Sequence, residues 1–261
     1  MKKIYLSLLT LLSGMLLTGC MNEDFSVADK NGKGTYALSL VREDVQDIVI
    51  SRAGEQVADG SYNVNDFKVN LTDKNGISIF QGKIYSELNA ADRTLPVGTG
   101  YKIMVESCSQ EEALTANDGW GQMRFTGETT FEIKNNETTP LEVNCTLQNA
   151  GLMVVFDESF TSKFPIYAAT TQDSRALVFK GTTTGKVACY NVEEENNSIS
   201  LKLTGSAGGW SDRIDIVKEV SIVKGKIMRL KVIYDDNSGD LDIEFGTDND
   251  MTDSDDDVTI Q

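Results

Sequence analysis

Residues 66–80 read Asp-Phe-Lys-Val-Asn-Leu-Thr-Asp-Lys-Asn-Gly-Ile-Ser-Ile-Phe, and this stretch decides the fold class. Apolar side chains at Phe67, Val69 and Leu71 alternate with polar ones, which is the period of a strand with one buried face. Asn75-Gly76 separates this run from a second alternating run that starts at Ile77. Because Asn and Gly both tolerate a positive φ, the pattern predicts a β-hairpin.

Similar short runs continue along the chain, so the sequence predicts an all-β protein. Clusters of turn-forming residues separate them, for example Asp236-Asn237-Ser238-Gly239, and this spacing is typical of β-sandwiches. One helix signal stands out, a capping box from Ser109 to Glu112, which predicts a short helix at 109–117. Further strands are expected at 36–40, 100–107, 127–133, 140–147, 151–156, 175–179, 186–192, 198–204, 213–217, 219–223, 226–234 and 240–245.

Two stretches of the first half are echoed in the second half. A glycine turn that leads into a strand is common in β proteins, so the echoes are either an internal duplication or convergent. We predict two related β-sandwich domains, at residues 34–147 and 148–261. In the first echo, 67–71 and 79–82 match 164–168 and 178–181; in the second, 96–103 matches 222–227.

The first nineteen residues have the features of a lipoprotein signal peptide. Lys2 and Lys3 precede an apolar run, 4–17, that is too short to span the ~30 Å core of a bilayer. Leu17-Thr18-Gly19-Cys20 follows, and small residues before a cysteine match the cleavage site at which the thiol accepts a lipid. We predict export through the Sec pathway, removal of residues 1–19, lipidation of Cys20 and a tether at residues 20–33. The alternative is an ordinary secretory peptide with an incidental cysteine.

The charge of the chain argues against nucleic acid as a partner. The 261 residues carry 24 basic and 40 acidic side chains, and loss of Lys2 and Lys3 takes the net charge from −16 to −18. Such a surface repels a phosphate backbone. Acidic residues are densest at Asp248–Asp257, where the spacing of an EF-hand is missing. We therefore expect a solvated acidic C-terminal segment there rather than a calcium site.

No residue pattern marks an active site. The chain contains no histidine, which excludes Ser-His-Asp and Cys-His catalysis and metal sites that need imidazole. Gly205–Trp210 is glycine-rich but lacks the Gly-Lys-Ser/Thr of a phosphate loop. Paired carboxylates can hydrolyse glycosides, but the sequence singles out no pair among 40 acidic residues. We predict no enzymatic activity, no catalytic residue, no cofactor and no metal.

Three cysteines remain besides Cys20, namely Cys108, Cys145 and Cys189. Their odd number and wide spacing indicate no disulfide framework. Cys145 falls on the apolar side of the alternating run 141–147, so we expect a buried free thiol there.

Both tryptophans lie beside glycines, in Gly119-Trp120-Gly121 and Gly209-Trp210. An aromatic ring on a loop can pack against the C–H face of a sugar. Alternatively, each ring closes the open end of a sandwich core. Trp120 follows the predicted helix in a loop, so it is the better candidate for ligand binding.

Several short motifs occur in an order that resembles a family of Bacteroidetes lipoproteins with a domain of unknown function. More distantly, the sequence is similar to fimbrillin-like proteins and their anchoring subunits. The resemblance implies two transthyretin- or immunoglobulin-like sandwiches and a cell-surface location, and Glu23-Asp24 is similar to the surface-export signals of such lipoproteins. The motifs are the Cys20 lipobox, Ile50–Ala53, Asp66–Val69, Leu95–Gly98, Trp120 and Val143–Leu147.

The same resemblance draws attention to Arg52. In some fimbrillins, trypsin-like cleavage after an early strand opens a groove for a partner's strand, and Arg52 follows the apolar run Ile48–Ile50. The alternative is an ordinary exposed arginine in a turn, and anchor subunits remain uncut.

We expect a lipid-anchored protein of the outer membrane, exposed on the cell surface, with a structural or adhesive role as a fimbrillin-like component or anchor. Its partners would be the membrane, through the lipid, and other fimbrial subunits. The alternative function is a surface glycan-binding lipoprotein that serves a carbohydrate uptake system.

Overall fold

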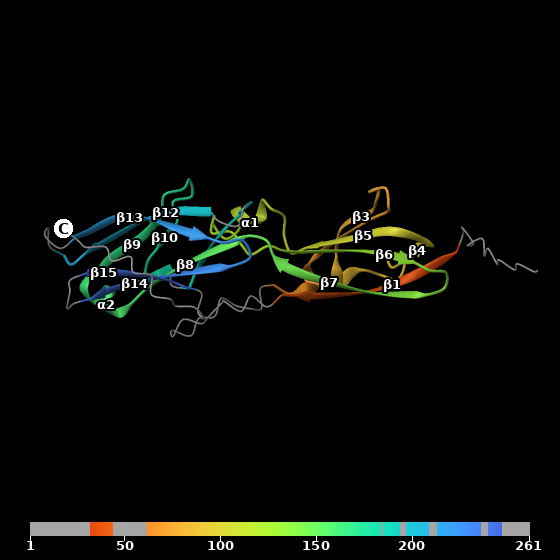
Figure 1. Cartoon of the computed structure of the whole chain (residues 1–261), viewed down its shortest axis with the longest axis horizontal. Helices are drawn as coiled ribbons and strands as arrows, with labels where there is room; N and C mark the ends of the chain where they lie inside the picture. The colour runs from red at the N-terminus through yellow and green to blue at the C-terminus, as the bar shows by residue number, and fades with distance from the viewer. Residues whose placement is uncertain are drawn as a thin grey trace, which may run out of the picture.

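The computed structural model describes residues 32–43, 62–183, 185–193, 197–208, 213–235 and 240–246. Strands dominate these residues, which confirms the predicted all-β fold, and they form two halves that lie end to end (Figure 1). The first half contains β1 (Lys33–Arg42), β2 (Lys68–Thr72), β3 (Ser78–Ile84), β4 (Thr94–Pro96), β5 (Gly98–Glu106), β6 (Phe125–Ile133) and β7 (Thr138–Leu147). The second contains β8 (Ala150–Phe156), β9 (Ile166–Thr171), β10 (Val178–Phe179), β11 (Val187–Tyr190), β12 (Asn197–Ser206), β13 (Arg213–Ile222), β14 (Ile227–Asp235) and β15 (Asp240–Gly246).

The predicted hairpin is present, formed by β2 and β3. Its turn is held by the carboxylate of Asp73, which accepts hydrogen bonds from the backbone N–H groups of Asn75 and Ile77, both at 2.8 Å. Gly76 alone takes the left-handed conformation, with a φ of 77°. Within the Asn75-Gly76 pair, only Gly76 therefore needs the positive φ that glycine adopts without strain.

The predicted helix is shorter than the sequence indicated. Its capping box is confirmed, because the N–H of Ser109 donates to Glu112 Oε2 (2.7 Å) and the N–H of Glu112 donates to Ser109 Oγ (3.1 Å). Helix α1 covers only Glu112–Thr115. The chain leaves the helix because Asn117 and Asp118 both have a positive φ, of 55° and 57°.

The first half is a seven-stranded sheet in the order β3-β2-β5-β6-β7-β1-β4. Strands β6 and β7 are paired at Phe125–Leu147 and Thr126–Thr146, where the sheet turns from one layer into the other. β1 runs parallel to β7 and antiparallel to β4. Buried side chains of both layers meet in one core, among them Tyr36 of β1, Val69 of β2 and Ile103 of β5.

The second half repeats the same topology. Its two four-stranded sheets have the orders β10-β9-β12-β13 and β11-β8-β14-β15. They correspond to the first-half layers β3-β2-β5-β6 and β4-β1-β7, including the parallel pair, which here is β8 with β14. β15 is additional and pairs along the outer edge of β14, from Asp235–Asp240 to Arg229–Gly246.

The shared topology shows which of the two sequence echoes joins equivalent elements of the two halves. The first echo joins equivalent elements, because 67–71 and 164–168 fall at β2 and β9, and 79–82 and 178–181 fall at β3 and β10. The second echo is wrong as a sign of duplication. It relates the β4–β5 region to the β13–β14 region, and these are not equivalent.

Two strand predictions are also wrong in detail. Segments 213–217 and 219–223 form one strand, β13, interrupted in its hydrophobic pattern by Lys218. Segment 175–179 is a strand only at Val178–Phe179, because Asp173 to Ala176 forms a turn closed by the hydrogen bond from Ala176 N–H to Asp173 O. Helix α2 (Glu158–Lys163) was not predicted; Asp157 caps it by accepting a hydrogen bond from Ser159 N–H at 3.0 Å.

The two halves have separate hydrophobic cores. The second is built around Phe160, Phe179 and Leu201, and it packs against Trp120 from the first half. The first core in turn includes Cys189 and Ile227 from the second half. The predicted boundary between residues 147 and 148 separates the strands of the two cores, and it stays a prediction. Cys108, Cys145 and Cys189 are free and buried, which confirms the buried thiol expected at Cys145.

Candidate functional site

Trp120 is the one ligand-binding candidate that lies within the described residues. The predicted lipidation site Cys20, the processing candidate Arg52, Trp210 and the acidic C-terminal segment all lie outside them. Trp120 belongs to the connection between β5 and β6, residues 107–124, which we call the junction loop. This loop lies where the two halves meet (Figure 1).

The junction loop holds Trp120 in an unusual backbone path. Asn117, Asp118, Gly119 and Gly121 all have a positive φ, and non-glycine residues in this region carry a conformational cost of about 1–2 kcal/mol each. The side-chain amide of Asn117 donates to Gly121 O at 2.8 Å and closes the turn. The loop therefore keeps a strained conformation that the rest of the structure must stabilise.

Contacts from the second half surround the indole of Trp120. Its ring packs edge-on against Phe179 with a centroid distance of 5.0 Å, and Lys186 Nζ lies 5.1 Å from the ring centroid. The carbonyl of Trp120 accepts a hydrogen bond from Cys189 N–H at 2.7 Å. The ring remains partly exposed. Trp120 thus covers one end of the second core and also reaches the surface, which combines the two interpretations that the sequence left open.

Arg175 of the second half fixes the junction loop. Its Nη1 donates to Gly119 O (3.2 Å) and to Cys189 O (2.8 Å), and its guanidinium carbon lies 4.1 Å from the ring centroid of Tyr190. Nε of Arg175 is 3.2 Å from Asp173 Oδ2. Burial alone would raise the pKa of Asp173, but the hydrogen bond from Thr171 and the charge of Arg175 outweigh it and lower that pKa. Asp173 is therefore charged near neutral pH and holds Arg175 in place.

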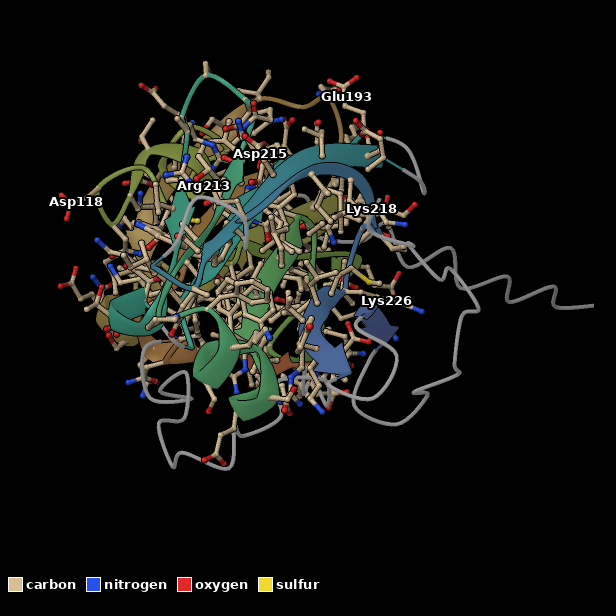
Figure 2. The ribbon with its side chains drawn as sticks, turned by 90° about the vertical axis from the view of Figure 1, so that its left-hand side faces the viewer. Asp118, Glu193, Arg213, Asp215, Lys218 and Lys226 are labelled. Atoms are coloured by element: carbon tan, nitrogen blue, oxygen red, sulfur yellow. The ribbon has the colours of Figure 1, made fainter. Side chains whose placement is uncertain are left out.

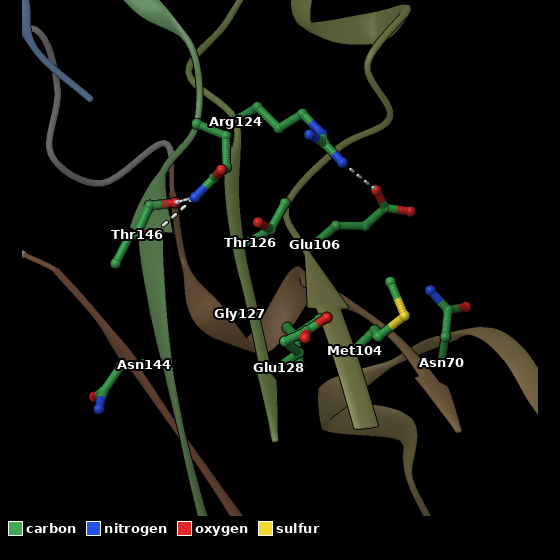
Figure 3. A pocket seen from close by; sticks show the side chains of 11 residues that line it. Asn70, Met104, Glu106, Arg124, Thr126, Gly127, Glu128, Asn144 and Thr146 are labelled. Carbon is green, nitrogen blue, oxygen red and sulfur yellow. Dashed lines mark hydrogen bonds and ion pairs between the residues drawn. The ribbon is translucent and has the colours of Figure 1, made fainter. Parts of the chain in front are cut away.

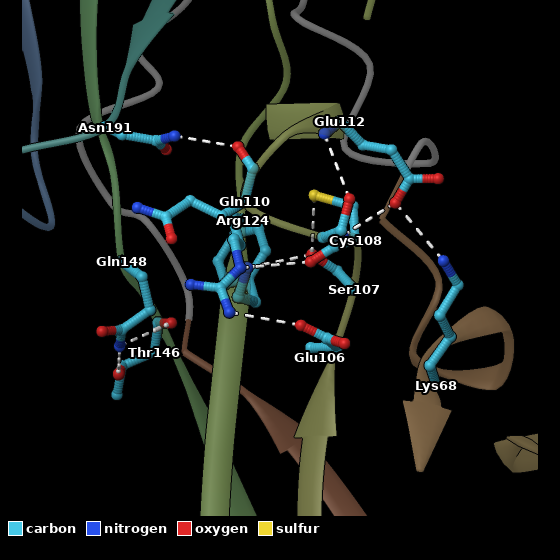
Figure 4. A network of polar contacts seen from close by, with 12 residues as sticks. Lys68, Glu106, Ser107, Cys108, Gln110, Glu112, Arg124, Thr146, Gln148 and Asn191 are labelled. Carbon is cyan, nitrogen blue, oxygen red and sulfur yellow. Dashed lines mark hydrogen bonds and ion pairs between the residues drawn. The ribbon is translucent and has the colours of Figure 1, made fainter. Parts of the chain in front are cut away.

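Two asparagines extend this contact between the halves. Asn149 is buried, accepts a hydrogen bond from Arg124 N–H at 3.0 Å and donates to Gln122 O at 2.8 Å. The side chain of Asn191 donates to Gln110 O at 2.8 Å (Figure 4). Because both ends and the middle of the junction loop are bonded to the second half, the loop is positioned rigidly.

A groove opens beside Trp120, and we call it the junction groove. It has a volume of about 490 Å³, within the range of small-molecule sites. Its walls combine aromatic rings with amide, carboxylate and ammonium groups. The lining residues are Tyr62, Asn117, Asp118, Trp120, Gly121, Gln122, Met123, Gly185, Lys186, Val187 and Cys189.

A second hollow, of about 390 Å³, lies on the outer face of the first half, where β6 separates from β7 (Figure 3). Arg124 Nη2 pairs with Glu106 Oε2 at 3.2 Å in this hollow, and Gln148 donates to Thr146 Oγ1 at 2.7 Å. Arg124 also donates through Nε to Cys108 O at 3.1 Å, and Glu112 pairs with Lys68 at 3.3 Å (Figure 4). Within this hollow, Arg124 is thus paired with Glu106 and Gln148 with Thr146.

Two buried thiols, Cys189 and Cys145, are unreactive at neutral pH. Burial raises the pKa of Cys189 to about 12 and that of Cys145 to about 11, so neither thiol is a nucleophile at neutral pH. Within the described ranges, no group of three or more His, Cys, Asp or Glu residues is placed to hold a metal ion.

Sequence reasoning singled out Trp120 but missed the residues that make its surroundings. Lys186 and Arg175 come from the second half, and Tyr62 lies just before β2. None of the three belongs to a motif, because only the contact between the halves brings them together. The glycines that flank Trp120 were the one readable signal.

The fold and the junction define a two-part, all-β protein built from one repeated topology. The chain belongs to the family described as Domain of unknown function (DUF4493), whose model matches residues 32–261. This confirms the predicted family with a domain of unknown function. Among curated proteins, none matches the sequence.

Solved structures resemble the chain distantly. A fimbrial assembly protein from Parabacteroides distasonis ATCC 8503 is 12% identical, with a TM-score of 0.44, and the match covers 84% of this chain and 97% of that one. The fimbrial anchor protein Mfa2 from Porphyromonas gingivalis is also 12% identical, with a TM-score of 0.37, covering 82% of this chain and 96% of that one. Both are of the kind that the fimbrillin-like resemblance named.

Proposed function

We propose that this chain is a lipid-anchored protein of the outer membrane, exported by the Sec pathway and displayed on the cell surface. Its role is structural or adhesive, as a fimbrillin-like component or anchor. The proposal includes no enzymatic activity, no cofactor and no nucleic-acid partner. Membrane attachment is assigned to the lipid on Cys20. No helix among the described residues has the length and apolar character needed to cross a bilayer.

One observation carries this proposal: the two halves form an elongated body, and the described part of the chain starts at one of its tips (Figure 1). β1 begins at Lys33, and this end of β1 lies at the tip of the first half, away from the junction (Figure 1). A lipid on Cys20 would therefore hold the first half near the membrane and the second half away from it. Such an arrangement suits a protein that presents a surface to a partner.

Lipid labelling tests the attachment. Cys20→Ala should abolish incorporation of a fatty-acid probe and leave the protein unprocessed or released. Cys108→Ala is the matched control, because Cys108 is buried and should leave labelling unchanged. Protease treatment of intact cells should degrade the parent protein if it is displayed outside. Equal labelling of Cys20→Ala and the parent would reject the anchored form.

The role of Arg52 separates a fibre component from an anchor. β1 pairs with β7 and β4 and supplies Tyr36, Leu38 and Leu40 to the first core, so its removal after cleavage at Arg52 would uncover that core. N-terminal sequencing of protein taken from the native cell surface distinguishes the two roles. Chains that start at Ala53 indicate a processed component, whereas chains that start only at Cys20 indicate an uncut anchor. Co-purification of other fimbrial subunits is expected in both outcomes.

A second candidate function is glycan capture for a carbohydrate uptake system. The observation that favours it is the junction groove, where the partly exposed ring of Trp120 lies beside Tyr62 and several hydrogen-bonding side chains.

A further inference from the structure

The junction groove has features that a purely structural joint does not require. A joint between two cores needs apolar contact, and Trp120 supplies it through Phe179. The groove in addition gathers polar side chains around the exposed part of the ring, namely Asn117, Asp118, Gln122 and Lys186. A few polar groups on an aromatic and apolar wall are the usual composition of a small-molecule site.

Trp120 retains an unused hydrogen-bond donor. Within the part of the chain that the structure describes, its indole N–H donates to no protein acceptor, and the ring is only partly buried. A buried indole usually finds a partner, so an indole N–H at a groove is available to a ligand. Lys186 Nζ lies over the ring at 5.1 Å from its centroid, so a ligand in the groove would meet the indole together with this ammonium group.

The charges of the groove select the class of ligand. The groove is lined by one carboxylate, Asp118, and one ammonium group, Lys186, which balance each other. The chain as a whole has a net charge of −16, so an anionic ligand would be repelled on approach. Asp118 lines the rim of the groove, and its carboxylate projects outward at the surface (Figure 2), so it can accept hydrogen bonds from hydroxyl groups of a ligand that extends past the rim. A neutral ligand rich in hydroxyls, with an apolar C–H face, matches this set.

The rigidity of the loop adds to this argument. Hydrogen bonds from Arg175 and from Cys189 N–H hold Gly119 O and Trp120 O before any ligand arrives. A preformed site avoids the ordering cost that a mobile loop would add to binding.

We propose that the junction groove binds a neutral oligosaccharide, with Trp120 as the ring against which a sugar unit packs and Asp118 and Lys186 as hydrogen-bonding groups at its sides. This inference rests on the second candidate function and names its site. It holds whether the sugar is captured for uptake or for adhesion.

The two tryptophans of the chain allow a direct test. In the full mature chain, purified in detergent, Trp210→Phe leaves Trp120 as the only tryptophan, and Trp120→Phe leaves Trp210. Maltoheptaose, xylohexaose, laminarihexaose and mannohexaose serve as neutral probes, and pentagalacturonic acid serves as the acidic one. At least one neutral probe should shift the emission of the Trp210→Phe protein saturably, and the acidic probe should bind at least tenfold more weakly.

Two variants locate the binding. Trp120→Phe keeps an aromatic ring against Phe179 but removes the indole, and calorimetric titration should show at least tenfold weaker binding. Asp118→Asn keeps a residue that tolerates the positive φ and should weaken binding several-fold with an unchanged melting temperature. Glu142→Gln on β7, exposed and far from the groove, is the control and should bind like the parent.

Two results would overturn the proposal. One is the absence of a saturable response to every neutral probe in the Trp210→Phe protein. The other is binding that stays unchanged in both Trp120→Phe and Asp118→Asn. Either result leaves lipid attachment and surface display intact, because these are measured separately by fatty-acid labelling and protease treatment of cells.

Discussion

The two halves of the chain share a topology but differ in the connection between equivalent strands. In the first half, the β5–β6 connection runs from 107 to 124 and reaches the second half through Trp120. In the second half, the β12–β13 connection is confined to 207–212. Each connection contains a Gly-Trp pair, Gly119-Trp120 and Gly209-Trp210. The longer β5–β6 connection of the first half therefore joins the two halves, whereas the equivalent β12–β13 connection only links two strands.

The halves also differ at the outer edge of one strand. In the second half, β15 covers the edge of β14 over seven paired positions. In the first half, the described pairing on the equivalent edge of β7 is limited to Phe125 and Thr126 of β6. Among the described residues, the first half therefore has seven strands and the second half has eight.

Deletion of Asp240–Gln261 is expected to have the largest effect. It removes β15 and the backbone hydrogen bonds of its seven paired positions, each with a net contribution of about 0.5–1.5 kcal/mol. The second half should lose roughly 3.5–10 kcal/mol of its free energy of unfolding, while the first half should be little affected. Hydrogen exchange resolved by peptide measures the two halves separately.

The matched control is deletion of residues 247–261 alone, which keeps β15. It should leave the exchange of β14 close to that of the parent. Equal losses in both deletions would mean that β15 is not what stabilises the second half.

Arg175→Ala should act at the joint. It leaves the carbonyls of Gly119 and Cys189 without their donor and exposes the charge of Asp173, at a cost of about 2–3 kcal/mol. Calorimetry should then resolve two transitions where the parent shows one, because the halves no longer unfold together. Arg213→Ala, at an exposed position of β13, is the control and should leave a single transition. A single thermal transition in Arg175→Ala at the melting temperature of the parent would mean that other contacts hold the two halves together.

Alkaline pH should lower the stability of the folded chain through its buried thiols, and just above pH 9 this effect should be small. Burial raises the pKa of Cys189 from 9.0 to about 12 and that of Cys145 to about 11. The folded chain keeps these protons, whereas the unfolded chain releases them near pH 9. Stability is therefore full below pH 9 and falls as the pH rises toward 11–12. Urea midpoints between pH 7 and 11 measure the slope, and the slope should be shallower in Cys189→Ala than in the parent. An equal slope in this variant would contradict the assignment.

The strands were predictable from the sequence because each one pairs a period-2 pattern with a local turn signal, as in Phe67–Leu71 followed by Asn75-Gly76. The errors arose where the local hydrophobic pattern did not indicate which strand a segment pairs with. Lys218 suggested a break, but it lies inside β13, where Leu201 is its neighbour on β12. The second echo failed because glycine turns recur at places that are not equivalent.

The candidate site was predictable only in part, for a physical reason. Trp120 carried a signal because its neighbours Gly119 and Gly121 both need a positive φ. Arg175 and Lys186 carried none, because their roles depend on how the halves pack together. Asn149 is a buried polar residue whose partners, Gln122 O and Arg124 N–H, are backbone groups far from it in sequence.

The central claim is that the junction loop joins the two halves into one rigid, elongated body. A distance distribution between spin labels on Glu142→Cys and Glu219→Cys, one exposed position in each half, tests it most directly. The buried native thiols Cys108, Cys145 and Cys189 have raised pKa values, so the introduced cysteines should react selectively. We expect a single narrow distribution that broadens in Arg175→Ala. A broad or bimodal distribution without that substitution would contradict it.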